Sequence, residues 1–208
     1  MVILWDFNGT IIDDVDICLK AENTLFAKYQ MDINVSRQQY LELFEFPVIN
    51  YYKKIGFDFN KVDFKTVSKE FMELYLSYQD EYRLNQGVLK KLKESKNAGN
   101  TNVIISASEQ QILNEQCKKL DISKYFDEIC GLDNVEAHSK LDMAKSWLEK
   151  HNYHRDNILF IGDSVHDFEV ANSLNVNCYL VASGHQSKQK LLAATNNVVD
   201  SITEVKIC

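Results

Sequence analysis

Several polar side chains follow short apolar runs at widely separated points of the chain. Asp6 and Ser106 come directly after such runs, and Asp163 follows one after a single glycine. Carboxylates can hold a hard cation or act as nucleophiles, and a hydroxyl can contact an anion. If the runs are parallel strands of an open α/β sheet, their carboxyl ends meet at one edge, and we expect these side chains to converge there on one ligand. Three more residues occupy supporting positions: Gly9, Lys140 and Asp167.

The apolar runs themselves are typical of strands that are covered on both faces. They consist almost entirely of large apolar residues, and they occupy Val2–Trp5, Val103–Ile105, Ile158–Ile161 and Cys178–Val181. Unbroken runs of this kind are common in parallel sheets with helices on both sides. Helical patterns alternate with them, so we predict a doubly wound parallel α/β sheet.

Helix boundaries can be predicted from capping residues and from apolar spacing. The interval from Val15 to Tyr29 keeps a helical period. Ser108 with Gln111 resembles a capping box that opens a helix through Leu120. Ser139 is expected to cap a helix whose inner face includes Leu141, Ala144, Trp147 and Leu148.

About ninety residues separate the first apolar run from the second, far more than a crossover connection needs. Within this interval 38–46 and 62–82 are expected to be helical, with Pro47 ending one segment. We therefore predict a helical cap domain formed by residues 16–83. The core domain would contain residues 1–15 and 84–208, resuming with an amphipathic helix over 84–96.

Composition and charge narrow the classes of partner. The 208 residues are 45% apolar and 25% charged, which is ordinary for a globular protein. The net charge of −7, without a basic stripe, argues against nucleic acid as a partner. No run reaches the roughly 20 apolar residues of a membrane span, and the first run is short for a signal peptide. The five cysteines lack Cys-x-x-Cys spacing, so we expect a reducing, cytoplasmic location.

Two segments resemble motifs of the haloacid dehalogenase (HAD) superfamily. Asp6-Phe7-Asn8-Gly9-Thr10 is similar to the first motif, Asp-x-Asp-Gly-Thr, and residues 162–167 are similar to the fourth, Gly-Asp-x-x-x-Asp. Ser106 and Lys140 match the second and third motifs. The helical insertion and the segment 184–187 resemble the phosphoglycolate-phosphatase-like branch of this superfamily.

This resemblance implies Mg²⁺-dependent hydrolysis of a small phosphorylated metabolite through an aspartyl phosphate on Asp6. It implies that Mg²⁺ is bound by carboxylates and one backbone carbonyl, with the last ligand binding directly or through water: Asp6, Asp163, the carbonyl of Asn8, and Asp167. It also implies a set of contacts to the phosphate: Lys140, Ser106 and the amides of Ala107 and Gly9. The oligomeric state stays open.

Asn8 departs from the first motif, because phosphatases of the family generally have a second Asp there that moves a proton. A carboxamide cannot do so, and general acid–base catalysis is typically worth roughly 10² to 10⁴-fold. Nearby Asp13, Asp14 and His166 are each expected to be structural. Three interpretations remain: a slow phosphatase, another hydrolase of the superfamily, or a weakly active phosphate-binding protein. A dehalogenase or phosphonatase would be the second case, and a phosphonatase needs a cap lysine such as Lys53 or Lys54.

Cap side chains are expected to decide which substrate is accepted. Candidates for contacting the leaving group are basic or aromatic: Arg37, Tyr40, Phe46, Tyr51, Tyr52, Lys53 and Lys54. We expect most of the aromatic ones to pack within the cap instead. Four histidines lack metal-ligand spacing and have no predicted site role: His138, His151, His154 and His185. Cys18 and Cys117 are predicted to be small core residues.

Overall fold

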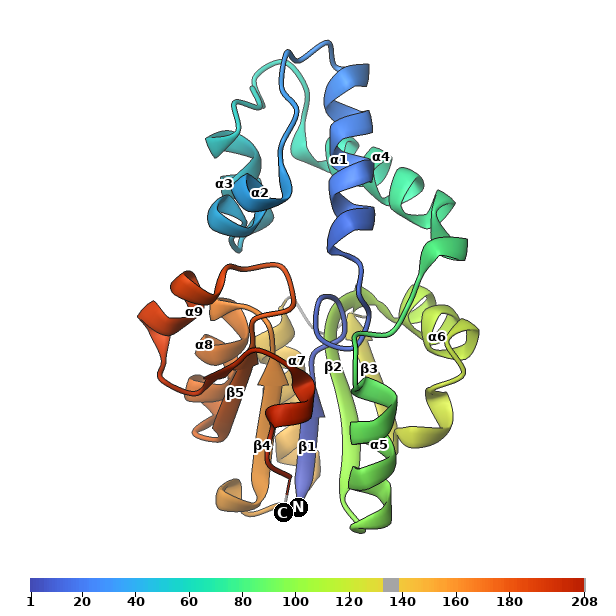
Figure 1. Ribbon diagram of the computed structural model, residues 1–208, viewed down its shortest axis with the longest axis vertical. Helices are drawn as coiled ribbons and strands as arrows, with labels where there is room; N and C mark the ends of the chain where they lie inside the picture. The colour runs from blue at the N-terminus through green and yellow to red at the C-terminus, as the bar shows by residue number, and fades with distance from the viewer. Residues whose placement is uncertain (133–138, 208) are drawn as a thin grey trace.

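The computed structural model describes residues 1–132 and 139–207, so His138 lies outside the described part of the chain. Within these ranges six parallel strands form one sheet in the order β3-β2-β1-β4-β5-β6 (Figure 1). The strands are β1 (Val2–Trp5), β2 (Thr101–Glu109), β3 (Glu128–Leu132), β4 (Ile158–Gly162), β5 (Asn177–Val181) and β6 (Val198–Val199). The predicted parallel α/β sheet is confirmed.

Strand β1 lies near the middle of the sheet, and its alternating side chains pack against both faces. Val2 is in register with Thr101 of β2 and with Ile158 of β4. Ile3 and Trp5 belong to one buried apolar cluster, whereas Val2 and Leu4 belong to another. Since both faces are buried, the strand shows an unbroken apolar run rather than alternation.

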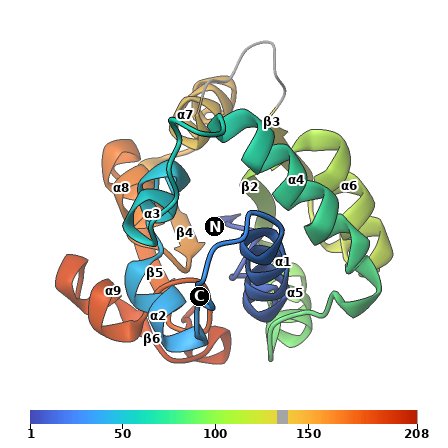
Figure 2. The same cartoon turned by 90° about the horizontal axis from the view of Figure 1, so that it is seen from above.

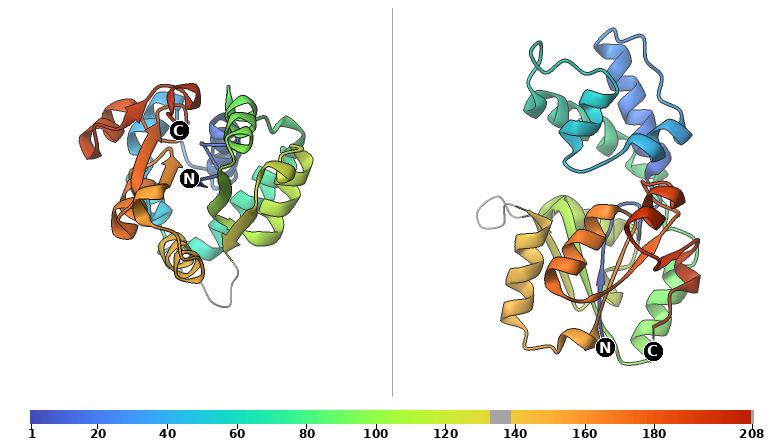
Figure 3. Two further views of the ribbon diagram at one scale, coloured as in Figure 1. Left: turned by 90° about the horizontal axis from the view of Figure 1, so that it is seen from below. Right: turned by 90° about the vertical axis from the view of Figure 1, so that its left-hand side faces the viewer.

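Helices from residue 88 onward cover the two faces of the sheet. On the face of Ile3 and Trp5 lie α5 (Val88–Asn97) and α6 (Gln110–Lys119). On the opposite face lie α7 (Lys140–Lys150), α8 (Val165–Leu174) and α9 (Lys188–Ala194). Figure 3 shows these layers from the side and from below. The arrangement is doubly wound, as the sequence predicts.

Four of the helices between β1 and β2 lie beyond the carboxyl edge of the strands (Figures 1 and 2). They are α1 (Val15–Lys28), α2 (Arg37–Leu43), α3 (Val48–Lys54) and α4 (Phe64–Ser77), followed by a 3₁₀ turn over Gln79–Glu81. We call α1–α4 the helical group. Its interior is aromatic: Phe26 packs edge-on against Tyr52 and close to Phe57. The exact division of the chain at residues 16 and 83 stays a prediction.

Some predicted boundaries differ from the structure. Ser108 does not cap a helix, because β2 continues to Glu109 and α6 begins at Gln110 without a side-chain cap. Ser139 does cap α7, accepting from the amide of Asp142. The short strand β6 and the half-buried strand β3 have no clear apolar run and were not predicted. Among the residues described, no helix combines the length and apolar character needed to cross a membrane.

Candidate active site

Asp6 is the first residue after β1, and the chain turns sharply behind it. Its amide donates to the carbonyl of Ile161 (2.8 Å), which continues the pairing with β4 by one residue. Gly9, in the turn, has a φ of +74°, and a Cβ there would lie 2.3 Å from Oδ2 of Asp163. Only glycine allows this close approach, so the turn brings the loop after β1 against the loop after β4.

The loop after β4 is fixed by a capping box at the start of α8. The Oδ2 atom of Asp167 accepts from the Ser164 amide (3.0 Å) and from the Ser164 hydroxyl (2.6 Å), while Ser164 Oγ accepts from the amide of Asp167. Asp163 and Asp167 are each only 2% exposed. They are therefore not the solvated start of a surface helix, and the free oxygen of Asp167 points to the next residue of the site.

Lys140, the first residue of α7, donates to Asp6 Oδ1 and to Asp167 Oδ1. It is 4% exposed. Burial alone would lower the pKa of its ammonium, but the two carboxylates outweigh burial and raise it. A buried cation at a helix amino terminus opposes the helix dipole, so the two carboxylates must hold it there.

Three carboxylates meet around this lysine. Oxygens of Asp6, Asp163 and Asp167 lie within 4.8 Å of one another, and all three residues are buried. Burial raises the pKa of Asp6 well above its usual value although Lys140 opposes the effect, and burial raises the pKa of Asp163 to about 6. For Asp167 burial acts in the same direction, but Lys140 outweighs it and the pKa is lowered. One lysine cannot neutralise three carboxylates, and such an oxygen set fits a hard divalent cation such as Mg²⁺.

One cavity of about 450 Å³ contains nearly all the predicted site residues. Those lining it are Asp6, Asn8, Ser106, Ala107, Lys140, Asp163 and Asp167. Gly9 lies behind the wall, against Asp163. Ser106 is 1% exposed, and its Oγ accepts from the amide of Ser108 (3.1 Å). The residues thus lie together, while the roles assigned to them stay predictions.

Asn8 is held by hydrogen bonds that use both ends of its amide. Its Nδ2 donates to Asp14 Oδ2 (2.7 Å) and to the Tyr75 hydroxyl (3.1 Å). Its Oδ1 accepts from Ser108 Oγ (2.8 Å). A carboxylate at this position would have no proton to donate to Asp14, so the surroundings favour an amide. Ser108 therefore helps to hold Asn8 rather than serving as the helix cap that the sequence predicts.

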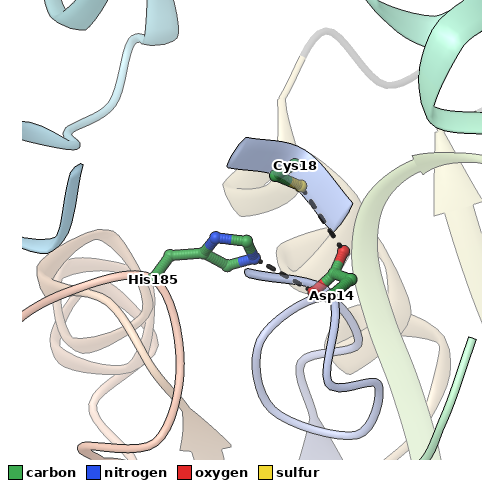
Figure 4. A group of neighbouring side chains, drawn as sticks. All are labelled: Asp14, Cys18 and His185. Atoms are coloured by element: carbon green, nitrogen blue, oxygen red, sulfur yellow. Dashed lines mark hydrogen bonds and ion pairs between the residues drawn. The ribbon is translucent and has the colours of Figure 1, made fainter. Parts of the chain in front are cut away.

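Asp14 and His185 form a second buried group beside Asn8, shown in Figure 4. His185 Nε2 lies 3.2 Å from Asp14 Oδ1, and its Nδ1 lies 2.8 Å from the Tyr40 hydroxyl. Burial would lower the pKa of His185, but Asp14 outweighs it and raises the pKa to about 9. The carboxylate of Asp14 also accepts from the Gly9 amide (2.8 Å), which ties this group to the turn behind Asp6.

Cys18 completes the group in Figure 4, with its sulfur 3.9 Å from Asp14 Oδ2. Burial raises the pKa of its thiol well above the usual value, so the sulfur stays protonated and is a poor metal ligand. The site role of His185 was missed, since sequence spacing gave it none. A usable signal existed, because the segment after β5 also ends at the carboxyl edge of the sheet.

The residues nominated on the cap have different positions. Tyr40, Phe46 and Tyr52 line the cavity. Tyr51 instead donates to the buried carboxyl of Glu22 (2.7 Å). The basic candidates lie outside the cavity: Arg37 pairs with Asp16, Lys54 pairs with Glu45, and Lys53 is exposed. His166, predicted to be structural, lines the cavity and packs against Phe46, with 5.0 Å between ring centroids.

Comparison with known proteins places these motifs in a family context. Residues 3–181 match the family model described as haloacid dehalogenase-like hydrolase. The pyrophosphatase PpaX of Oceanobacillus iheyensis is 26% identical over 183 residues, which cover 86% of this chain and 82% of that protein. The phosphoglycolate phosphatase of Vibrio parahaemolyticus is 26% identical over 120 residues, covering 57% of this chain and 53% of that protein.

The fold also has solved counterparts. The crystal structure of CbbY from Rhodobacter sphaeroides in complex with phosphate superposes with a TM-score of 0.76 at 19% identity. The match covers 98% of this chain and 95% of that one. At this identity the likeness concerns the fold, including an arrangement of helices beyond the carboxyl edge of a parallel sheet.

Proposed function

The chain belongs to the haloacid dehalogenase-like hydrolase family, and on this premise we propose that it hydrolyses a small phosphomonoester with Mg²⁺ through an aspartyl phosphate on Asp6. One observation carries the proposal: Asp6, Asp163 and Asp167 are buried together around Lys140. A protein that only binds phosphate has little use for a buried carboxylate aimed at the anion, since the two repel each other.

In the proposed first step, an oxygen of Asp6 attacks phosphorus and the bond to the ester oxygen breaks. The electron pair leaves with the alkoxide, which takes up a proton from solvent water and departs as the alcohol. In the second step water attacks phosphorus, the bond to Asp6 breaks, and phosphate is released. Splitting one displacement in this way gives two easier steps.

Positioning and charge neutralisation would supply most of the catalysis. Asp6, Asp163, the carbonyl of Asn8 and Asp167 would hold Mg²⁺, whose charge would offset that of the phosphoryl oxygens and keep Asp6 ionised. Lys140 donates to Asp6 and would also reach the phosphate, fixing nucleophile and substrate together. Ser106 and the amide of Ala107 would donate to the remaining phosphoryl oxygens. The predicted contact from the Gly9 amide is not proposed, because this amide already donates to Asp14 Oδ1.

Asn8 cannot protonate the leaving alkoxide. We therefore propose a slow phosphatase, or one that favours esters whose alkoxide leaves easily. Among the described residues that line the cavity, the only lysine is Lys140, which does not favour a phosphonatase: Lys53 is exposed and Lys54 pairs with Glu45 at the surface. We further propose that the helical group belongs to a cap over residues 16–83 that excludes water from the core of residues 1–15 and 84–208.

The test is the release of phosphate from a panel of phosphomonoesters, with and without Mg²⁺, by wild type, Asp6→Asn and Asp13→Asn. Asp13 is an exposed carboxylate of the same loop, so its variant controls for loss of charge. The proposal predicts turnover that requires Mg²⁺, persists in Asp13→Asn and vanishes in Asp6→Asn. Phosphate binding without turnover in the wild type, on every ester, would instead favour a binding protein.

A further inference from the structure

The cavity that contains Asp6 extends far beyond the volume a phosphate needs. Its floor is the carboxyl edge of the sheet, where Asp6, Ser106 and Lys140 lie, and its other walls belong largely to the helical group and to the segments that join its helices. An ester whose phosphate sits at Asp6 must place its alcohol portion in this remaining space. The side chains that line this space therefore indicate which kind of leaving group the cavity can accept.

These walls are predominantly apolar. The apolar side chains facing the cavity from the helical group and its connecting segments are Phe44, Phe46, Val48, Phe64, Phe71 and Met72. Three of the polar side chains on these walls are already engaged: the Tyr40 hydroxyl contacts His185, the Tyr75 hydroxyl donates to Asp14, and Glu22 accepts from Tyr51. A polyhydroxylated alcohol would lose its hydrogen bonds to water here and recover few of them.

The charges around the cavity are unfavourable for a second anionic group. Among the described residues that line it, Lys140 is the only Lys or Arg, and Asp6 and Asp167 already pair with it. The undescribed residues 133–138 and 208 include no Lys or Arg in the sequence. Glu109 also lines the cavity, and the two histidines that line it lie against carboxylates, His185 against Asp14 and His166 against Glu169. A carboxylate or second phosphate on the ligand would thus meet no unpaired lysine, arginine or histidine among the described side chains that line the cavity.

Building on the proposed function, we infer that the substrate is the monophosphate ester of an apolar alcohol, aliphatic or aromatic, that carries no second anionic group. The apolar part would rest against Phe71 and Met72 of α4 and against Phe44 and Phe46 across the cavity. Pyrophosphate and phosphoglycolate both fail this description, so the specificity differs from what the names of the matched relatives indicate.

The inference is tested with esters that differ in the alcohol portion and have alcohols of similar acidity. Ethyl, hexyl and 3-phenylpropyl phosphate are compared with phosphoglycolate by kcat/KM in the presence of Mg²⁺. Each buried methylene is worth about fourfold, so we expect hexyl phosphate to exceed ethyl phosphate by at least about tenfold. The kcat/KM of phosphoglycolate should fall below that of ethyl phosphate. A kcat/KM of phosphoglycolate equal to or above that of hexyl phosphate overturns the inference.

A charge introduced into the wall provides the matched variant. Met72→Lys places an ammonium in the cavity from α4, whereas Ser77→Lys places one on an exposed position of the same helix. We expect Met72→Lys to raise the kcat/KM of phosphoglycolate relative to that of hexyl phosphate by about tenfold or more. The reason is that an anion in a poorly solvated site is stabilised by a nearby cation. Ser77→Lys should leave the ratio unchanged. Equal shifts in both variants would contradict the inference.

A binding measurement separates this inference from the proposed function. Calorimetry with hexylphosphonate and phosphonoacetate reports on the cavity without any turnover. Tighter binding of hexylphosphonate with no hydrolysis of any ester would support the apolar cavity and overturn the phosphatase. Turnover that favours phosphoglycolate, with tighter binding of phosphonoacetate, would support the phosphatase and overturn the apolar cavity.

Discussion

Replacing Asn8 by Asp introduces the carboxyl of the motif that this segment resembles, and it places that group against Asp14. The Nδ2 atom of Asn8 lies 2.7 Å from Asp14 Oδ2, so the substituted carboxyl would meet a second carboxyl at hydrogen-bond distance. Asp14 itself stays ionised: burial would raise its pKa, but His185 lowers it, with help from the hydrogen bonds of Asn8 and Tyr75. The new carboxyl must therefore carry the proton.

The magnitude follows from the cost of holding that proton. Two ionised carboxylates at this distance would repel by about 6 kcal/mol at an effective dielectric constant of 20. Protonating a carboxyl of pKa near 4 at pH 7 costs about 4 kcal/mol, which is the cheaper outcome. Because residue 8 is only partly buried, we expect Asn8→Asp to lower the free energy of unfolding by about 2 to 4 kcal/mol at pH 7.

The sign of the pH dependence is fixed by the raised pKa in the folded state. The folded variant keeps a proton that the unfolded chain releases above pH 4, so the loss in its free energy of unfolding grows as pH rises from 4 to 7. At pH 5 this loss should shrink to about 1 kcal/mol. Urea unfolding of wild type and variant at pH 5 and pH 7 measures the loss.

Two further variants control the comparison. Asn8→Ala removes the hydrogen bonds without adding an acid, so its free energy of unfolding should fall by the same amount at both pH values. The double variant Asn8→Asp/Asp14→Asn restores one acid and one amide and should recover part of the stability at pH 7. An Asn8→Asp variant as stable as the wild type at pH 7, or one whose deficit is independent of pH, would refute the reasoning about this contact.

Further predictions concern stability and charge. Burial raises the pKa of Glu22 to about 8, so Glu22→Gln should raise the free energy of unfolding by about 3 kcal/mol at pH 7 and by almost nothing at pH 4; equal gains at both would contradict this. Gly9→Ala adds a Cβ 2.3 Å from Asp163 and should abolish phosphate release, whereas Gly99→Ala, with φ +72° but open space around it, should cost only about 1 kcal/mol in urea unfolding. If both alanine variants still release phosphate, the close approach at Gly9 is unimportant. Lys140→Met leaves the buried carboxylates without their cation, so it should lower stability by about 3 to 5 kcal/mol at pH 7, and less at pH 5 where they can protonate. Unchanged stability in urea would refute that.

Much of the sheet could be predicted because each of its central strands is covered on both faces. Val2–Trp5 and Ile158–Gly162 are buried throughout, and their sequences therefore show unbroken apolar runs. The convergence of Asp6, Ser106 and Asp163 follows from the direction of the strands alone. Edge strands have a weaker sequence pattern. Strand β3 is mostly half-buried and begins with Glu128, so nothing in its sequence distinguishes it from a loop.

The surroundings of Asn8 could not be predicted, since they depend on contacts between distant segments. His185 and Asp14 are 171 residues apart in sequence, and Ser108 is 100 residues from Asn8. Neither spacing has a local signal. Ser108 also satisfies the pattern of a helix cap, and only the extension of β2 to Glu109 decides against it. Which cap aromatics face the cavity depended on packing, as Tyr51 and Tyr52 on the same helix show: Tyr52 lines the cavity and Tyr51 does not.

The most direct measurement of the central claim is a search for phosphate on Asp6 during turnover. Wild type and Asp6→Asn are mixed with Mg²⁺ and an ester that is hydrolysed, quenched in acid within the first turnover, and digested for peptide mass spectrometry. The account predicts a phosphorylated peptide containing Asp6 in the wild type, formed before free phosphate, and none in Asp6→Asn. Sustained hydrolysis with no phosphate on Asp6, or turnover that survives in Asp6→Asn, would contradict it.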